Sequence, residues 1–317
     1  MSNVNSGWYI FEGDGEKKNS IEFPEAPAYR KKKKLYVTSK DKDSKEVQIV
    51  NASIYLKRPI LVTGKPGLGK SSLAYAVANE LDLELVKWEI GTKTVLNDGL
   101  YNYDAIARLQ SASLKEDIDI SKYLFLGPLG YAFSATEKPV VLLIDEIDKS
   151  DIDLPNDLLH IFEEMEFTIK ELERADKDGK GIDIYPTHTK DKSIKIKNGK
   201  VSLQDTKNFP IIIMTSNDER EFPPAFLRRC LRLDIQRPDK EKLLDIVSAH
   251  FDKTREEIET IKEVDNILEK FLHLQDEEGA TLSTDQLLNA MQLLFGDEAI
   301  NILDYPELEK IIFKSLE

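Results

Sequence analysis

Residues Ile60–Ser71 read ILVTGKPGLGKS, and this segment guides the interpretation of the rest of the chain. Together with Pro59, its first four residues form the short apolar run Pro59–Thr63, of the kind found in a buried parallel strand. The remainder fits the pattern G-x-x-x-x-G-K-S, in which glycines allow backbone N–H groups to face phosphate oxygens. The apolar face of Ser71–Leu81 predicts a helix, whose positive end would point at the same phosphates. A strand before the loop and a helix after it distinguish a phosphate-binding loop from an ordinary glycine turn.

The loop predicts a site for a nucleoside triphosphate with a metal ion. Lys70 would reach the β and γ phosphates, and the Ser71 hydroxyl would hold Mg²⁺. ATP and Mg²⁺ are therefore the expected cofactors. The expected nucleotide-binding residues are Gly64, Lys65, Pro66, Gly67, Leu68, Gly69, Lys70, Ser71 and Ser72.

Two carboxylates follow a second apolar run, Val140–Ile144. In open α/β sheets, ligands bind at the carboxyl ends of the strands, where the phosphate loop would also lie. Asp145 would then bind the metal, directly or through water, and Glu146 would polarise the attacking water. The structural alternative is that these two residues only cap the next helix.

A third strand, Ile211–Met214, leads to Asn217. Beside the acidic strand, its amide could orient the water between Glu146 and the γ-phosphate, although an asparagine after a strand usually makes a turn. Further on, Arg228 and Arg229 end a short predicted helix. They are either surface charges or the source of an arginine finger supplied to a neighbouring subunit.

Alternating strands and helices predict an α/β, three-layer P-loop domain with a mainly parallel sheet, followed by a small all-α lid. The expected boundaries are an irregular arm over 1–46, the nucleotide-binding domain over 47–237 with an insertion at about 166–208, and the lid over 238–317. Asn198-Gly199 suits the turn of a hairpin that joins Ser193–Lys197 to Lys200–Leu203 and protrudes. The other expected elements are helices at Val47–Leu56, Leu100–Leu114, Glu241–Phe251 and Glu256–Leu274, a strand at Leu83–Ile90, and helices that start at Ser283 and Pro306.

Composition limits the classes of function. Of 317 residues, 41% are hydrophobic and 32% charged, as in a globular protein, and the net charge of −14 argues against a nucleic-acid partner. The single cysteine, Cys230, allows no internal disulfide and fits a reducing compartment. No apolar run reaches the roughly 18 residues that a membrane span needs, and the N-terminus lacks the apolar core of a signal peptide. A cytoplasmic protein without membrane contact is expected.

These motifs together resemble those of MoxR-type AAA+ ATPases, from about Val47 to the C-terminus. Asp145–Lys149 is similar to the family's Asp-Glu-Ile-Asn-Arg segment, and Gly127–Gly130 to its Gly-Pro motif. The residues that carry the remaining resemblance are Trp88–Thr92, Gly99–Asp104, Leu158–Glu164 and, in the arm, Pro24–Arg30.

The resemblance implies a ring, usually a hexamer, with ATP held between subunits. It implies a chaperone-like remodeler of a protein partner, commonly one with a von Willebrand factor A domain, and a subgroup associated with bacterial conflict or antiviral defence. By position, Asn217 corresponds to the family's first sensor, and Arg229 to its arginine finger, with Arg228 the close alternative. The predicted hairpin at Asn198-Gly199 corresponds to the pre-sensor insertion.

One position departs from the family. Its second-sensor arginine usually opens the third lid helix, where this chain has Asp285, and a carboxylate cannot contact a γ-phosphate favourably. Two alternatives to an ATP-driven remodeler remain, and the missing arginine motivates the first. One is a nucleotide-sensing scaffold that hydrolyses slowly and recruits an effector. The other is an AAA+ protein that prefers GTP.

Overall fold

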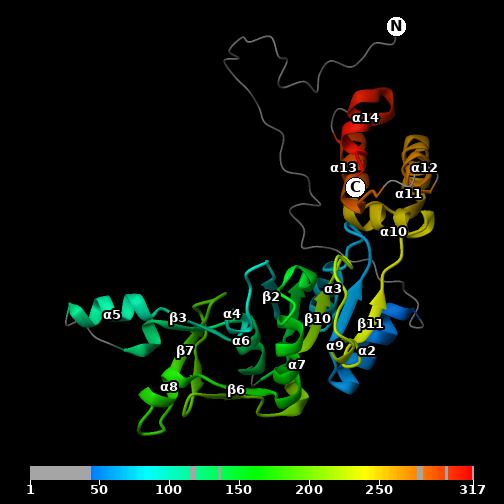
Figure 1. Ribbon diagram of the computed structural model, residues 1–317. Coiled ribbons are helices and arrows are strands. Elements are labelled where there is room, and N and C mark those ends of the chain that lie inside the picture. The colour runs from blue at the N-terminus through cyan, green and yellow to red at the C-terminus, as the bar shows by residue number, and fades with distance from the viewer. Residues whose placement is uncertain (1–43, 115–118, 135–136, 277–280, 297–298, 316–317) are drawn as a thin grey trace, which may run out of the picture. The chain divides into compact units, whose positions relative to one another are not determined.

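The computed structural model describes residues 44–114, 119–134, 137–276, 281–296 and 299–315 (Figure 1). These residues form two compact units. The sheet unit comprises Lys70–Ile235 with the chain leading up to Gly64. The helical unit comprises Gln236–Glu317 with Lys65–Gly69, the tip of the glycine loop. Almost all of the predicted arm, including Pro24–Arg30, lies outside the described residues.

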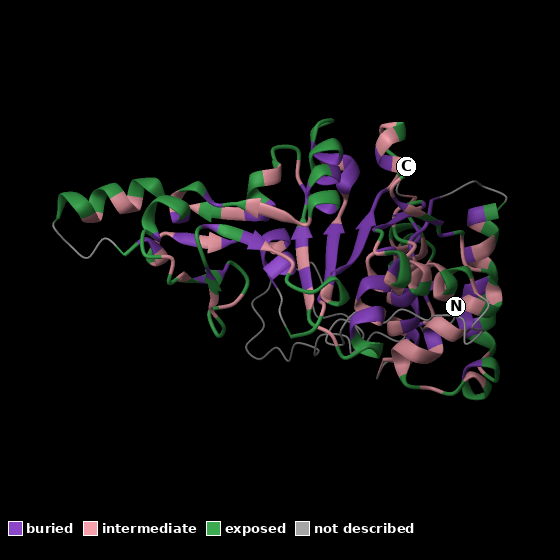
Figure 2. Ribbon diagram, turned by 90° about the horizontal axis from the view of Figure 1, so that it is seen from below, coloured by how far each residue is buried: buried purple, intermediate pink, exposed green. Residues whose placement is uncertain are grey.

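A five-stranded sheet forms the centre of the sheet unit, in the order β11-β1-β10-β5-β2. Every neighbouring pair in it is parallel. Its central strands consist almost wholly of buried apolar side chains, which are coloured as buried in Figure 2. The strands are β1 (Ile60–Thr63), β2 (Leu85–Glu89), β5 (Val141–Asp145), β10 (Ile211–Thr215) and β11 (Leu231–Asp234).

Helices flank this sheet, as the alternating sequence pattern predicts. Helix α3 (Ser72–Glu80) directly follows the glycine loop and buries Leu73, Ala74, Val77 and Ala78. Helix α2 (Lys45–Leu56) begins at the N-cap residue Ser44, whose side chain accepts a hydrogen bond from the Val47 backbone N–H. The other helical segments of this unit are α4 (Leu96–Leu100), α5 (Ala105–Ser113), α6 (Pro128–Ser134), α7 (Leu154–Glu164), α8 (Lys170–Ala175), α9 (Pro224–Leu227), η2 (Ile120–Lys122), η3 (Ile147–Lys149) and η4 (Thr206–Asn208). A parallel sheet with helices and an all-α region confirms the predicted fold class.

The prediction of a single helix over Leu100–Leu114 is wrong. Helix α4 ends at Leu100, β3 (Tyr101–Tyr103) pairs with β4 (Leu124–Leu126), and only Ala105–Ser113 forms the helix α5. Leu100, Ile106 and Leu109 have helical spacing, yet the side chains of Ile106 and Leu109 are 70% and 68% exposed. Helix α5 lies at the end of the sheet unit away from β11, and it is coloured as exposed or intermediate in Figure 2.

The turn predicted at Asn198-Gly199 forms, but the hairpin does not continue from it. Both residues have positive φ, and the Lys200 N–H donates to the Lys197 carbonyl oxygen at 3.0 Å. Beyond that bridge the strands separate. Strand β8 (Ile194–Ile196) pairs with β7 (Ile182–Pro186), and β9 (Lys200–Ser202) pairs with β6 (Glu166–Thr168). The buried side chains of Ile196 and Val201 hold both strands in the core of the unit, so neither forms a free arm.

The helical unit has its own apolar core. Ser283 caps α13 with the reciprocal hydrogen bonds of the predicted capping box, and Pro306 opens α14 as expected. The prediction of a single helix over Glu256–Leu274 is wrong. One helix ends at Glu259, and the next begins at Lys262. The helical segments are α10 (Lys240–Phe251), α11 (Arg255–Glu259), α12 (Lys262–Asp276), α13 (Thr284–Phe295), η5 (Ile302–Asp304) and α14 (Pro306–Ile312).

Candidate nucleotide site

The register of three neighbouring strands places the predicted motifs at one edge of the sheet. Val62 in β1 pairs with Thr215 in β10, and Met214 in β10 pairs with Ile144 in β5. Because these strands are parallel, the segments that follow them emerge side by side. The glycine loop follows β1, the carboxylates end β5, and Asn217 comes two residues after β10.

The glycine loop has the backbone that the phosphate-binding pattern requires. Gly64, Gly67 and Gly69 have φ values of 140°, 77° and 80°, a region that L side chains rarely adopt. Lys70 is 7% exposed, and its ammonium donates to the Gly64 carbonyl oxygen at 2.6 Å. Burial lowers the pKa of Lys70, although the nearby carboxylates of Asp148, Asp218, Asp145 and Glu146 oppose that shift. A buried cation at the start of a helix is well placed to attract phosphate.

Ser71 and Asp145, the two expected metal-binding residues, lie in direct contact. The Ser71 hydroxyl donates to Asp145 Oδ1 at 2.6 Å, and the Thr215 hydroxyl donates to the same oxygen at 2.7 Å. Hydroxyl and carboxylate oxygens are hard ligands that suit Mg²⁺. The described residues contain no group of three His, Cys, Asp or Glu side chains placed to hold a metal. A magnesium ion at Ser71 and Asp145 would therefore take its remaining ligands from phosphate and water.

Lys87 is an ion-pair partner of Asp145 that the sequence does not predict. Lys87 lies in β2, the neighbour of β5, and its Nζ is 3.3 Å from Asp145 Oδ2 and 2.7 Å from Glu89 Oε1. Burial would raise the pKa of Asp145. The hydrogen bonds from Ser71 and Thr215 and the charge of Lys87 outweigh that effect, so the pKa is lowered. The carboxylate is thus held in its charged, metal-binding form. An alternating strand pattern would flag Lys87 as solvent-facing and would not show what it touches.

Glu146 has a strained backbone. Its φ of 62° and ψ of 48° lie in the left-handed region, which costs a residue with a side chain about 1–3 kcal/mol. The Glu146 N–H donates to Thr215 Oγ1 at 2.9 Å, and its carboxylate accepts from Lys149 Nζ at 2.7 Å. Strain that persists because neighbouring groups hold it is typical of functional sites. It also argues against the simple capping alternative, since the Glu146 side chain makes no cap hydrogen bond to the following 3₁₀ helix.

Replacing Thr215 with valine is expected to destabilise the protein by about 1–3 kcal/mol, because the change leaves the Glu146 N–H without its acceptor. Urea denaturation at neutral pH measures the loss. This pH lies well above the usual pKa of 3.8 for an aspartate, so the stabilisation linked to the lowered pKa of Asp145 is fully present there. Thr168→Val, at an exposed strand position, is the matched control and should change little. Equal effects of the two substitutions would contradict the assigned role of Thr215.

Asn217 lies beside the acidic strand end, as predicted. It is half-buried, and its backbone N–H donates to Asp148 Oδ2 at 2.7 Å. Its side-chain amide lies 3.5 Å from Glu219 Oε1. The structure therefore brings Asn217 into one network with the Asp145–Asp148 segment.

The two arginines differ in their surroundings. Arg229 is half-buried, pairs through Nε with the Glu163 carboxylate, and donates through Nη1 to the Ala225 carbonyl oxygen at 3.2 Å. Arg228 is exposed, and the structure gives it no ion pair among the described residues. Neither arginine makes a described polar contact with Asp145 or Glu146, so within this chain they are not brought into the site.

The helical unit contains the loop tip and the start of α13. The Thr284 N–H donates to the Gly67 carbonyl oxygen at 3.1 Å, and Lys65 Nζ donates to Thr281 Oγ1 at 3.3 Å. Asp285 is exposed in the first turn of α13. Thr281 thus places a hydroxyl group beside the loop tip.

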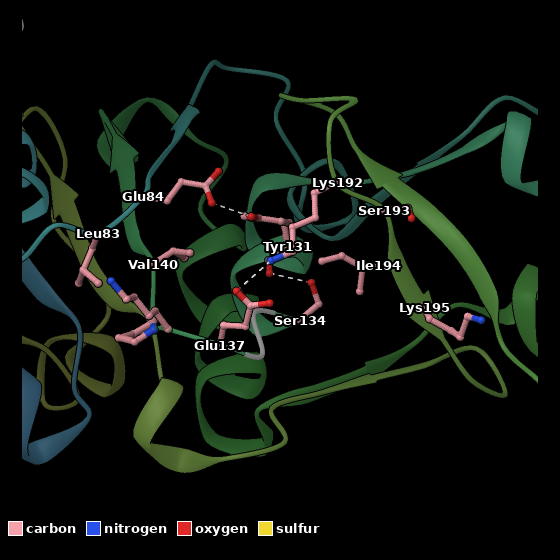
Figure 3. Close-up of a pocket in the computed structure, with 12 residues that line it drawn as sticks. Leu83, Glu84, Tyr131, Ser134, Glu137, Val140, Lys192, Ser193, Ile194 and Lys195 are labelled. Carbon is pink, nitrogen blue, oxygen red and sulfur yellow. Dashed lines mark hydrogen bonds and ion pairs between the residues drawn. The ribbon is translucent and has the colours of Figure 1, made fainter.

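A separate hollow of about 570 Å³ lies at the opposite edge of the sheet (Figure 3). Glu84, which precedes β2, and Val140, which precedes β5, both line it, whereas the phosphate loop follows the carboxyl end of β1. Glu84 accepts hydrogen bonds from the Tyr131 hydroxyl at 2.6 Å and from His188 Nε2 at 3.1 Å. Its position separates this hollow from the residues that the phosphate chemistry requires.

Cys230 is placed as a poorly reactive thiol, because the effect of burial on its pKa outweighs that of the nearby Arg58 charge. It is buried, and burial raises its pKa to about 12. Among the helices of the described residues, none has the length and apolar character that a bilayer span requires.

Comparison with known protein families identifies the family of the chain. Residues 60–240, more than half of the chain, match the ATPase family associated with various cellular activities (AAA). The chain belongs to this family, whose members bind nucleotide.

Two solved structures resemble the chain at low identity. A candidate ATPase from Cytophaga hutchinsonii is 15% identical with a TM-score of 0.39, over 86% of this chain and 79% of the other. A RuvB point mutant from Thermotoga maritima is 17% identical with a TM-score of 0.37, over 84% of this chain and 75% of the other. No curated protein sequence matches the chain.

Proposed function

We propose that the chain binds ATP with Mg²⁺ on the loop Gly64–Ser72 and hydrolyses it through the carboxylates that end β5. The observation that carries this proposal is the 2.6 Å hydrogen bond between Ser71 and Asp145, which joins the loop to the acidic strand. A bound Mg²⁺ would neutralise developing charge on the phosphates. Lys70 holds the phosphates, Glu146 accepts the proton of the attacking water, and Asn217 orients that water.

We further propose that the chain is a MoxR-type protein that assembles as a ring. In this proposal the ring remodels a protein partner that carries a von Willebrand factor A domain. Close glycine packing supports the motif resemblance on which this rests. A side chain at Gly99 would collide with the Trp88 ring, and one at Gly127 would collide with the Gly99 backbone. The resembling segments over Trp88–Thr92, Gly99–Asp104 and Gly127–Gly130 therefore depend on one another for their packing. The association with bacterial defence belongs to the same proposal.

Phosphate release from ATP and from GTP, measured with the purified chain, tests the hydrolytic function. Faster turnover of ATP supports the proposal, and faster turnover of GTP makes the chain a GTP-preferring member. Ring assembly with ATP but no phosphate release above that of Glu146→Gln would identify a nucleotide-sensing scaffold. That result would fit the presence of Asp285 where the family usually has its second-sensor arginine.

The arginines give a test of action between subunits. We expect Arg228→Ala or Arg229→Ala to lower turnover by about 10³-fold or more if that residue is the finger. Mixing the inactive arginine variant with Glu146→Gln subunits should restore part of the turnover, because some interfaces then combine an intact finger with an intact glutamate. Arg232→Ala, an exposed position on β11, is the control. Mixed rings that show no recovery would contradict a finger supplied in trans.

A further inference from the structure

Asp148 has no chemical role in the proposed hydrolysis, yet it contacts the segment that carries Asn217. It belongs to η3, two residues after Glu146, and is 3% exposed. Its Oδ2 accepts two backbone hydrogen bonds from the segment after β10, from Asn217 N–H at 2.7 Å and from Glu219 N–H at 3.3 Å. One buried carboxylate oxygen thus ties the end of one strand to the end of its neighbour.

The backbone of the bound segment explains why a single oxygen can accept both bonds. Asp218 has a φ of 60°, in the left-handed region, so the flanking N–H groups of Asn217 and Glu219 converge. Such a concave arrangement of N–H groups binds anions. The Asp148 carboxylate fills it and thereby fixes the direction in which the chain leaves β10.

The second oxygen of Asp148 shows that stability alone does not account for the residue. Asp148 Oδ1 is buried and has no hydrogen-bond partner among the described residues. A buried polar atom without a partner costs free energy, so the presence of Asp148 is not explained by its contribution to stability.

We propose that Asp148 is a positioning residue for hydrolysis, which fixes Asn217 relative to Glu146 through the hydrogen bond from the Asn217 N–H to Oδ2. The inference rests on the proposed hydrolytic function. Asp148 itself touches no reacting atom in this account. It sets the orientation that the Asn217 amide needs when it aligns the attacking water, so its removal should lower kcat more than it raises KM.

A double-mutant cycle tests this role. Asp148→Ala should lower kcat on the order of 100-fold, as a misplaced catalytic group does, with KM changed only a few-fold. In a chain that already carries Asn217→Ala, the same substitution should have almost no further effect, because the group it positions is gone. Asp148→Asn keeps an acceptor for the Asn217 N–H and should restore most of the turnover. Asp153→Ala, an exposed position with no side-chain cap hydrogen bond, is the matched control.

Amide hydrogen exchange at Asn217 and Glu219 provides a readout that does not need turnover. Exchange should accelerate in Asp148→Ala and stay near the parent rate in Asp148→Asn. Both variants should keep a melting temperature well above the assay temperature. Additive losses in the cycle, or no rescue by asparagine, would overturn the positioning role while the parent still hydrolyses ATP. A parent with no turnover above that of Glu146→Gln would instead overturn the proposed function, and the exchange rates would still decide whether Asp148 holds the segment.

Discussion

Replacing Lys70 with alanine is expected to weaken ATP binding on the order of 100-fold or more. The Lys70 ammonium is buried beside the Gly64 carbonyl oxygen and would make charge-assisted hydrogen bonds to phosphate, each of which contributes about 1.5–3 kcal/mol. Since about 1.4 kcal/mol corresponds to a factor of ten, the loss of two such bonds accounts for the expected effect. Equilibrium titration with a fluorescent ATP analogue measures it without any dependence on hydrolysis.

The control for this substitution is Lys177→Ala, which removes the same charge from an exposed turn of the sheet unit. Its affinity for ATP should match that of the parent. An affinity of Lys70→Ala within a few-fold of the parent would show that the nucleotide does not bind on this loop.

Replacing Glu146 with glutamine should lower turnover by about 10²–10⁴-fold while ATP still binds. Glutamine has nearly the same size and keeps the backbone bond from Glu146 N–H to Thr215, but it cannot accept a proton from water. Steady-state phosphate release at saturating ATP and Mg²⁺ measures kcat, and the titration used for Lys70 shows that binding persists.

Glu164→Gln tests whether any loss is specific, because it makes the same chemical change at an exposed position near the end of α7. It should leave kcat unchanged. If Glu146→Gln also keeps its full turnover, another group must serve as the base, and the role given to the end of β5 is wrong.

The sequence predicts those parts of the site whose residues are neighbours in the chain. A glycine loop between a strand and a helix, or two carboxylates after five apolar residues, specifies both local structure and chemistry. The predictions for Lys70, Ser71 and Asp145 depend on such local patterns and on the rule that parallel strands end at one edge.

The contacts that the sequence does not predict join residues far apart in the chain. Thr215 reads as one polar residue at the end of an apolar strand, yet it bonds both Asp145 and the Glu146 backbone, about 70 positions away. For Lys87 and Asp148, the local sequence does not indicate any contact with the site. Their roles depend on sheet order and register, which no local pattern encodes.

The secondary-structure errors have the same origin. The turn at Asn198-Gly199 is predictable because the backbone preference of these two residues is local. The strands on either side of it pair instead with β6 and β7, which are more distant in the sequence. In Leu100–Leu114, the apolar spacing predicts a helix, but Tyr101–Tyr103 pairs with β4, which is distant in the sequence. Periodicity alone cannot show which side of an element will be covered.

A structure of the chain with Mg²⁺ and a non-hydrolysable ATP analogue would show directly where the nucleotide binds. We expect phosphates against Lys70 and the backbone N–H groups of the glycine loop, with the metal at Ser71 and Asp145. A nucleotide bound elsewhere, such as in the hollow beside Glu84 at the opposite edge of the sheet, would contradict this expectation.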